Sequence, residues 1–339
     1  MTRKDASTWV GGSRPIQVFE EELRRVAKSD ATVLFVGESG TGKGAASLRL
    51  HQASRPEEPF VVVHLAALTP SLVEAALFGH EKGAFTDARK ERPGFFRQAG
   101  RGTLLLDDVD LLPLEVQPKL LRVLQERVVE PLGSATPVPV EARVVATTNR
   151  DLLAEVEAGR FRRDLYYRLA VVTLELPPLR ARREDLPRFV ETFEQRLCER
   201  LGVEPRSFTD EALERLAAHP WPGNVRELEN ALERVLVLGR DQGEPVPVEA
   251  GELDFLEEPL RGIERELAAR ALAHGLNLEE LTRALLEEAL AENRGNVSAA
   301  ARQVGLTRRA FDYRMAHSEP PPVEKPAKGS KAQKKDSAP

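Results

Sequence analysis

One stretch of this sequence constrains its fold more than any other, the glycine-rich GESGTGKG at residues 37–44. It follows the apolar run TVLFVG and precedes a helical pattern, which is the setting of a GxxxxGK phosphate-binding loop. In such a loop the glycines let backbone N–H groups turn toward phosphates, and the lysine adds positive charge. A purely structural glycine turn is the alternative. The residues expected to bind ATP are Gly37, Glu38, Ser39, Gly40, Thr41, Gly42, Lys43 and Gly44.

The rest of the first half alternates between strand-like and helix-like segments. Four more apolar runs of strand length follow the loop, FVVVHL, TLLLDD, ARVVATT and AVVTLEL, with helical patterns between them. Such alternation predicts an α/β fold with a mostly parallel sheet covered on both faces. From residue 180 to Gly239 the pattern is purely helical, and the Pro- and Gly-rich DQGEPVPVEAG that follows predicts a strand-free linker.

Two of these strands end in polar side chains, at the edge where parallel sheets bind ligands. LLLDD ends in Asp107 and Asp108. We expect Asp107 to hold Mg²⁺ and Asp108 to orient or deprotonate an attacking water, a solvated turn being the alternative. VVATTN ends in Thr148 and Asn149, which are placed to sense a γ-phosphate.

Charge is distributed unevenly along the chain. The total of 49 Lys and Arg against 54 Asp and Glu gives a net charge of −5, which excludes a uniformly basic nucleic-acid binder. Residues 293–317, however, contain five Arg and one Asp, which favours a nucleic-acid-binding end. The single Cys198, the lack of an apolar leader and the lack of an apolar run of about 18–20 residues predict a soluble, cytoplasmic protein without a membrane partner.

The basic segment NRGNVSAAARQVGLTRRAFDYRM has the pattern of a helix–turn–helix. Ala301, Gly305 and Phe311 stand at the small, turn and core positions, and a plain helical hairpin is the alternative. Asn296 and Thr307 are expected to cap the second and third helices, and the third helix to present its charges to DNA. The residues expected at the DNA interface are Asn296, Thr307, Arg308, Arg309, Asp312 and Arg314.

Seven motifs occur in the order seen in one family: GESGTGKG, GHEKGAFTDA, GTLLLDD, LLRVLQERVVEPLG, ATTNRDL, GRFRRDLYYRL and WPGNVRELEN. The chain therefore resembles the sigma-54-dependent transcription activators, NtrC-type AAA+ ATPases, over about residues 11–239. Its C-terminal segment resembles their Fis-like domain. The resemblance implies an activator that binds enhancer DNA and uses ATP to remodel the closed complex of sigma-54 RNA polymerase into the open complex. The alternatives are a DNA-binding regulator whose slow or vestigial ATPase serves nucleotide-gated assembly, and a AAA+ remodeller of another protein.

The resemblance also implies residue roles. The GAFT loop would touch the sigma-54 factor, supported by a second loop near residues 130–137. The cluster of Arg160, Arg162, Arg163 and Arg168 reads by itself as a solvated basic face. In the family, Arg162 and Arg168 would reach the nucleotide of a neighbouring subunit, which implies a homo-oligomeric ring, typically a hexamer. Arg226 would contact the nucleotide of its own subunit. The residues implied to contact the sigma factor are Gly83, Ala84, Phe85, Thr86, Asp87 and Ala88.

Four positions depart from the family pattern. Asp87 replaces a glycine of GAFTGA, Asp108 replaces a glutamate, and Gly44, directly after the loop lysine, also replaces a glutamate of the family. His64 stands where the family has an asparagine that acts as a switch by pairing with that glutamate. We expect His64 to donate to Asp108 and to offset the shorter acid, a core histidine being the alternative. Together the departures predict slow hydrolysis.

The patterns also predict domain boundaries. An arm of 13 residues would leave no room for an N-terminal regulatory domain, so regulation is expected from a trans-acting protein, from expression level or from the acidic segment 249–292. The expected segments are an arm 1–13, an α/β ATPase subdomain 14–178, a helical lid 179–240, an acidic linker and helical segment 241–278, the helix–turn–helix 279–317 and a disordered Lys- and Pro-rich tail 318–339.

Overall fold

The structure is a computed structural model that describes residues 9–84, 90–134, 136–239, 246–256, 270–272, 274–275, 277–293 and 295–317. These residues fall into two compact units, Met1–Asp254 and Phe255–Pro339. Most of the expected arm, the whole expected tail and four of the expected sigma-factor contacts lie outside the described residues. Those four contacts are Phe85, Thr86, Asp87 and Ala88.

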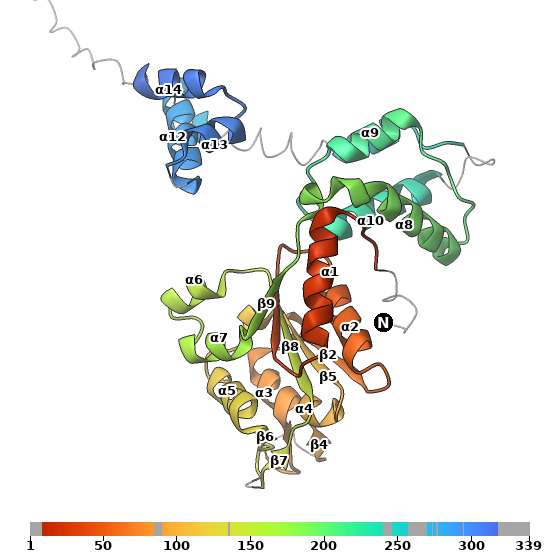
Figure 1. Ribbon diagram of the computed structural model, residues 1–339, viewed down its shortest axis with the longest axis vertical. Coiled ribbons are helices and arrows are strands. Elements are labelled where there is room, and N and C mark those ends of the chain that lie inside the picture. Colours follow the sequence, from red (N-terminus) through yellow and green to blue (C-terminus); the bar gives the residue numbers. More distant parts are fainter. Residues whose placement is uncertain are drawn as a thin grey trace, which may run out of the picture. The chain divides into compact units, whose positions relative to one another are not determined.

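A five-stranded parallel sheet forms the centre of the first unit (Figure 1). Each of the five apolar runs found in the sequence forms one of its strands. The strand order is β2-β5-β8-β1-β9. The phosphate loop follows β1, and the next strand along the chain, β2, lies at one edge of the sheet with β8 and β5 between it and β1. The strands are β1 (Val33–Val36), β2 (Phe60–His64), β5 (Thr103–Asp107), β8 (Arg143–Thr148) and β9 (Val172–Glu175).

Helices cover both faces of the sheet (Figure 1). Neighbouring strand residues point to opposite faces, and accordingly Val33 and Phe35 join one buried cluster with α1 and α2, while Leu34 joins another with α3, α5, α6 and α7. Two separate cores therefore fix the position of each strand end. The helices of this layer are α1 (Arg14–Ala27), α2 (Lys43–Ser54), α3 (Pro70–Phe78), α4 (Phe95–Gln98), α5 (Gln117–Glu126), α6 (Leu152–Glu157) and α7 (Arg163–Leu169).

Two short antiparallel hairpins project from this layer. One pairs β3 (Gly79–His80) with β4 (Arg92–Pro93), and the other pairs β6 (Val128–Val129) with β7 (Val138–Pro139). The sequence shows no strand pattern around GHEKGAFTDA, although its first two residues form β3. Two residues are too few to produce an alternating pattern, and they pair only because β4 returns beside them.

A helical lid follows the sheet through the 3-10 turns η3 (Leu179–Ala181) and η4 (Arg183–Asp185). The buried carboxylate of Asp185 accepts the N–H groups of Gly12 (2.6 Å) and Ser13 (2.8 Å), and also the Ser13 hydroxyl (2.6 Å). The segment before α1 is therefore bonded to the beginning of the lid. The lid helices are α8 (Leu186–Leu201), α9 (Asp210–Ala218) and α10 (Asn224–Leu238).

The expected end of the lid at residue 240 was wrong. The Val248 N–H donates to Ser207 O (2.7 Å), and the Thr209 N–H donates to Val248 O (3.1 Å). Arg206 donates two hydrogen bonds to the carboxylate of Glu252, at 2.8 and 2.9 Å. Val248 is buried between these bonds, so part of the predicted linker belongs to the lid, including the residues of η6 (Ala250–Leu256) up to Asp254. A single bridging residue carries no strand pattern that the sequence could reveal.

Among the described residues of the second unit, the helices with defined bounds are α12 (Leu278–Glu292), α13 (Val297–Gln303) and α14 (Arg308–His317). Asn277 and Glu280 form a capping box that starts α12. The core is small and is made by Leu286, Ala289, Ala300, Ala301 and Phe311. Across the described parts of both units, no helix is long and apolar enough to cross a membrane.

Candidate functional site

The phosphate loop connects β1 to α2 at the carboxyl edge of the sheet. Its lysine, Lys43, is almost fully buried and donates from Nζ to Gly37 O (2.7 Å) and Glu38 O (3.0 Å). Burial lowers the pKa of Lys43, while Asp108 and Asp107 act in the opposite direction. The loop thus holds one cation at the N-terminus of a helix, where free N–H groups and the helix dipole favour an anion.

The lid rests on this loop. Gly40 has a left-handed φ of 78°, and a Cβ there would lie 2.2 Å from Gly223 O of the lid. The Val225 N–H donates to Gly40 O at 3.0 Å. Arg226, expected at the nucleotide, donates to Ser39 Oγ at 2.9 Å. Only glycine allows so close a backbone approach, so the start of α10 is fixed against the phosphate loop.

Side chains from the sheet–lid connection complete this junction. Arg180 forms a forked ion pair with Glu38, and Asn224 donates to the same carboxylate at 3.1 Å. Mainly through the Arg180 hydrogen bond, the pKa of Glu38 falls to about 2, against the opposing effect of burial. Arg182 donates to Thr41 O at 2.7 Å. Sequence reasoning identified none of these three partners, because 141 to 186 residues separate them from the loop.

The two acids stand beside the loop at the end of β5. Asp107 accepts a hydrogen bond at Oδ1 from the Thr147 hydroxyl (2.6 Å), and its Oδ2 lies 2.9 Å from His64 Nδ1. The expected bond from His64 to Asp108 was therefore wrong. β2 and β5 pair in a register that places His64 opposite Asp107, and the chain leaves the strand at the next residue. His64 is also no core residue, since 58% of its side chain is exposed.

Asp108 leaves the strand in a left-handed conformation, with φ 58° and ψ 57°. Its N–H donates to Thr147 Oγ1 at 3.0 Å. Burial, followed by the charges of Asp107 and Asp110, raises the pKa of Asp108, and Lys43 opposes the rise. A carboxylate whose pKa is raised accepts a proton more readily, which suits a group that orients or deprotonates water.

The strand β8 ends beside these acids. Thr148 is buried, and its hydroxyl donates to Asp110 Oδ1 at 2.6 Å. Asn149, the next residue, is exposed. Of the two residues expected to sense a γ-phosphate, only Asn149 is therefore open to a ligand, while Thr148 holds a neighbouring acid.

The acidic edge fits Mg²⁺ only together with a nucleotide. Within the described parts of the chain, no group of three or more His, Cys, Asp or Glu side chains could by itself hold a metal ion. Mg²⁺ commonly takes one or two carboxylates and completes its shell with water and substrate phosphates. Asp107 and Asp108, whose charges act on Lys43, offer this donor set beside the phosphate loop. Gly44 adds no hydroxyl, and a Cβ there would meet no heavy atom within 4 Å.

The arginine cluster lies at the start of α7 and along it. Arg162 donates two hydrogen bonds to the carboxylate of Asp164, at 3.0 and 2.7 Å. Arg160 donates two to the carboxylate of Glu155, at 2.6 and 2.9 Å. Arg168 donates to Leu124 O at 3.2 and 2.9 Å. These arginines and Arg163 are exposed, so they are available to a neighbouring molecule.

The second hairpin is bonded to the base of the first. The Leu132 N–H donates to Gly79 O, and the Glu81 N–H donates to Leu132 O, both at 2.9 Å. Gly133 packs so closely on Ala84 that a Cβ would lie 3.0 Å from the Ala84 Cβ. The described part of the loop near residues 130–137 therefore holds the base from which the other loop, beginning at Gly83, extends.

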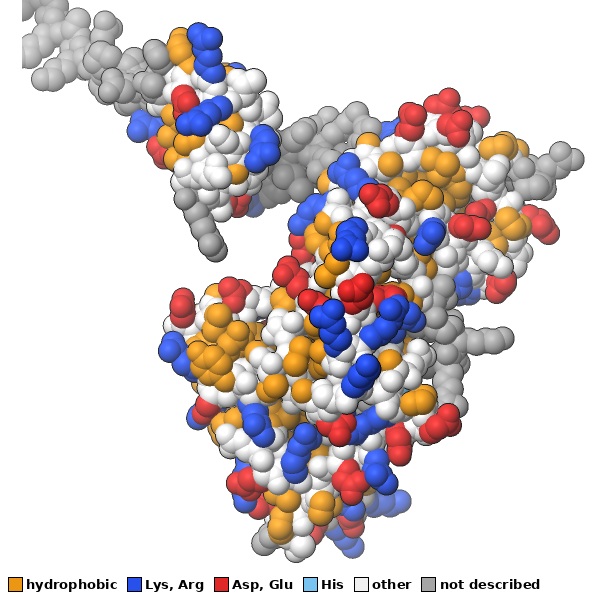
Figure 2. Space-filling view, viewed as in Figure 1, with side chains coloured by type: hydrophobic (Ala, Val, Ile, Leu, Met, Phe, Trp, Pro, Cys, Tyr) orange, Lys and Arg blue, Asp and Glu red, His pale blue; other side chains and the backbone are white. Residues whose placement is uncertain are grey.

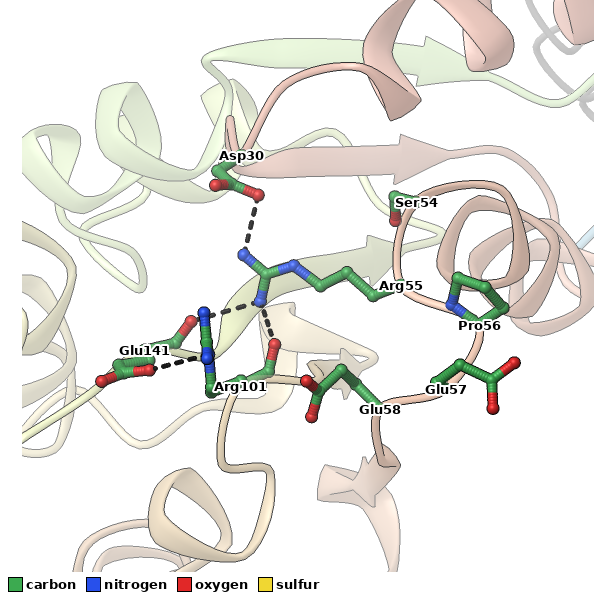
Figure 3. A pocket seen from close by; sticks show the side chains of 8 residues that line it. All are labelled: Asp30, Ser54, Arg55, Pro56, Glu57, Glu58, Arg101 and Glu141. Atoms are coloured by element: carbon green, nitrogen blue, oxygen red, sulfur yellow. Dashed lines mark hydrogen bonds and ion pairs between the residues drawn. The ribbon is translucent and has the colours of Figure 1, made fainter.

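A polar pocket lies at the opposite edge of the sheet, where β1, β5 and β8 begin (Figure 3). Arg55 fills much of it and bonds to Asp30 (2.7 Å), Gly102 O (2.7 Å) and Glu141 O (3.2 Å). Arg101 pairs with Glu141 across the rim at 3.2 Å. Arg55 thus connects three chain segments, and its position at the amino ends of the strands separates this pocket from the phosphate loop.

The C-terminal unit presents basic side chains on α14. Asn296 accepts the Ala299 N–H (3.2 Å) and Thr307 accepts the Ala310 N–H (3.3 Å), so both act as the expected helix caps. Gly305 has a left-handed φ of 70° in the turn. Arg308, Arg309, Asp312 and Arg314 are exposed, and Arg308 lies 3.9 Å from Asp312. On the face of the first unit seen in Figure 2, by contrast, acidic and basic side chains are interspersed.

Comparisons with known proteins agree with this geometry. Models of the sigma-54 interaction domain, the AAA+ ATPase lid domain and the Fis-family bacterial regulatory proteins match residues 9–175, 180–250 and 277–317. The transcriptional regulatory protein ZraR of Escherichia coli K12 is 45% identical over 305 residues, covering 89% of this chain and 67% of that protein. The response regulator PilR of Pseudomonas aeruginosa is 42% identical over 311 residues, covering 90% and 68%.

The chain belongs to the sigma-54-dependent transcriptional activators. NtrX of Brucella abortus is similar in structure, at 33% identity and a TM-score of 0.68 in complex with ATP, covering 93% of this chain and 70% of that one. Its complex with ADP gives 32% identity and a TM-score of 0.69, covering 92% and 70%. The predicted fold class is confirmed: this activator combines an α/β AAA+ domain, a helical lid and a helix–turn–helix.

Proposed function

We propose that this activator binds enhancer DNA, hydrolyses ATP and uses the energy to remodel the closed complex of sigma-54 RNA polymerase into the open complex. One arrangement carries the proposal. The buried Lys43 of the phosphate loop lies beside Asp107 and Asp108, and the loop itself is hydrogen-bonded to the lid. The same chain carries a projecting loop and a basic helix, which would supply the two macromolecular contacts.

At the nucleotide, each group would have a separate task. Lys43 and the loop N–H groups would bind the phosphates. Asp108, with its raised pKa, would orient or deprotonate the attacking water. Asp107 would hold Mg²⁺, which supplies neutralisation of phosphate charge. Arg226 and Asn149 would contact the nucleotide from the lid and from β8.

Assembly into a ring would complete the site. Arg162 and Arg168 are exposed on the first unit and are bonded to Asp164 and to a backbone carbonyl. Guanidinium groups supplied by a neighbouring subunit would stabilise charge on the transferring phosphate. We therefore propose that the active form is a homo-oligomer, most simply a hexamer.

The chain path offers a route from nucleotide to loop. His64, in contact with Asp107, is followed by the turn η1 (Leu65–Ala67), by α3 and then by the hairpin at Gly79. A γ-phosphate can bias the loop only through contacts made in one state and lost in the other. We propose that His64 reports the nucleotide state along this path, and that Phe85 and Thr86 touch the sigma factor.

At the other end of the chain, α14 would bind the enhancer. Arg308, Arg309 and Arg314 lie on an exposed helix behind a capped turn. Arginine can bind phosphate or pair with guanine at two atoms. This contact would keep the activator near its promoter while the loop acts on the polymerase.

Hydrolysis should be slow. Asp108 is one methylene shorter than glutamate, which withdraws its carboxylate by roughly 1.5 Å, and a misplacement near 1 Å can cost about 100-fold in rate. In the structure His64 contacts Asp107, so it does not extend the reach of the shorter acid. If the short acid limits the rate, Asp108→Glu should raise ATP turnover. No increase would show that another step limits hydrolysis.

The decisive experiment measures ATP turnover and promoter melting by the full chain with Mg²⁺. Turnover in the wild type that disappears in Lys43→Ala supports the motor. Phe85→Ala should keep its ATPase activity and lose open-complex formation with purified sigma-54 RNA polymerase. A wild-type protein that binds nucleotide without turnover would instead favour nucleotide-gated assembly on DNA. Promoter opening that survives Phe85→Ala would refute the loop contact.

A further inference from the structure

One buried hydroxyl touches both acids of the nucleotide site. Thr147, the second-last residue of β8, is 0% exposed. Its Oγ1 donates to Asp107 Oδ1 at 2.6 Å and accepts the N–H of Asp108 at 3.0 Å. A hydroxyl can donate once and accept twice, so this one donates to the last residue of the neighbouring strand β5 and accepts from the residue that follows it.

This hydroxyl acts where the sheet pairing stops. The register between β5 and β8 ends at Leu106 and Ala146. Beyond it the chain turns at Asp108 into the left-handed region, which a non-glycine residue seldom adopts without local support. Thr147 gives the Asp108 N–H an acceptor in place of the sheet ladder and so stabilises the turn from which that carboxylate extends.

The same hydroxyl restricts Asp107. The carboxylate has one oxygen on Thr147 and the other on His64. Thr147 is fully buried, whereas 58% of the His64 side chain is exposed to competing water. A hydrogen bond to a charged group is stronger in a buried setting, so the Thr147 bond is the firmer of the two restraints on the Asp107 rotamer.

We propose that Thr147 is a positioning residue of the nucleotide site, whose hydroxyl fixes the rotamer of Asp107 and the turn that directs Asp108. The inference rests on the proposed ATPase function and concerns how its two acids are aligned. Thr147 acts through these acids and does not itself touch the nucleotide. If Thr147 served only packing, its replacement by valine, a β-branched residue of the same shape, would have no specific effect on the two acids.

The test compares Thr147→Val, which keeps the shape and loses the hydroxyl, with Thr147→Ser, which keeps the hydroxyl. Both are made in the full chain, with Thr147→Ala as a second variant without the hydroxyl. Three quantities are measured: the melting temperature, kcat and KM for ATP, and the affinity for a non-hydrolysable ATP analogue with and without Mg²⁺. The analogue measurement needs no turnover.

Thr147→Val should lower kcat by about 10- to 100-fold while KM stays within about threefold, and should reduce the gain in analogue affinity that Mg²⁺ gives. Thr147→Ser should recover most of both. Valine equal to wild type in both readouts would overturn the proposal, and so would serine no better than valine. If valine does not fold, Thr147→Ala must show the same losses. If the wild type never turns over ATP, the ATPase proposal fails. The positioning role of Thr147 would be overturned separately if Mg²⁺ increased analogue affinity equally in the wild type and in Thr147→Val.

Discussion

The nucleotide edge, meaning the carboxyl edge of the sheet with the phosphate loop and the two acids, and the basic helix α14 hold their charged side chains in opposite ways. At the edge, Lys43, Glu38 and Asp107 are each bonded to other groups of the protein, several of them buried. On α14, Arg308 and Arg309 are exposed, and the ion pair from Arg308 to Asp312 spans 3.9 Å. Phosphoryl transfer requires groups aligned before the reaction, whereas attraction to a DNA backbone requires mainly charge on one face.

The two regions also differ in what supports them. The sheet is fixed by two buried clusters that involve helices on both faces. Among the described residues of the C-terminal unit, the core cluster has five buried residues, of which Phe311 is the only aromatic. A single core substitution should therefore destroy the small unit, while the nucleotide edge should be sensitive to small changes in backbone approach and hydrogen bonding.

The largest effect is expected for Phe311→Ala. Removing a buried phenylalanine costs about 3–5 kcal/mol, which is comparable with the whole stability of a small domain. The C-terminal unit should unfold, and DNA affinity measured by fluorescence anisotropy should fall roughly 100-fold or more. ATP turnover should persist. Leu285→Ala, at an exposed position of α12, is the matched control and should change neither quantity. DNA affinity within threefold of wild type in Phe311→Ala would show that the small core is not what holds α14.

A smaller effect is expected at the contact between phosphate loop and lid. Gly40→Ala places a Cβ against Gly223 O at a left-handed φ, and this strain costs about 1–2 kcal/mol or more. Affinity for an ATP analogue should fall about tenfold, as measured by calorimetry. Gly44→Ala is the control in the same loop. Its Cβ has open space, and alanine favours the helix by up to about 1 kcal/mol, so it should bind the analogue normally and melt slightly higher. Equal behaviour of the two variants would contradict the close lid contact.

The smallest effect is expected for Arg309→Ala. Loss of one phosphate contact should reduce the slope of log affinity against log salt by about one and weaken binding several-fold at low salt. The measurement is a salt titration of DNA affinity. Arg283→Ala, on α12 and paired with Glu287 at 2.9 Å, should leave the slope unchanged. An unchanged slope in Arg309→Ala would remove this arginine from the DNA contact.

Local sequence patterns predicted the strands, the phosphate loop and the helix caps, but they did not predict contacts between residues far apart in the chain. The five strands, the phosphate loop and the caps Asn296 and Thr307 depend on residues close in sequence, so spacing and residue type reveal them. The partner of His64 depends on strand register, which no single strand discloses. The role of Thr147 as a bridge between two acids depends on a neighbouring strand 39 or 40 residues away. The predicted end of the lid was wrong because one bridging residue, Val248, produces no periodic pattern in the sequence.

The bond network around Asp185 has a mechanical consequence. Its carboxylate grips the backbone just before α1 and stands at the turn where the lid begins. Tension applied to the chain ahead of Ser13 would thus reach the turn η4, where the lid begins, without first deforming the sheet. A partner that pulled on this segment would therefore act on the connection from which Arg182 bonds to the phosphate loop.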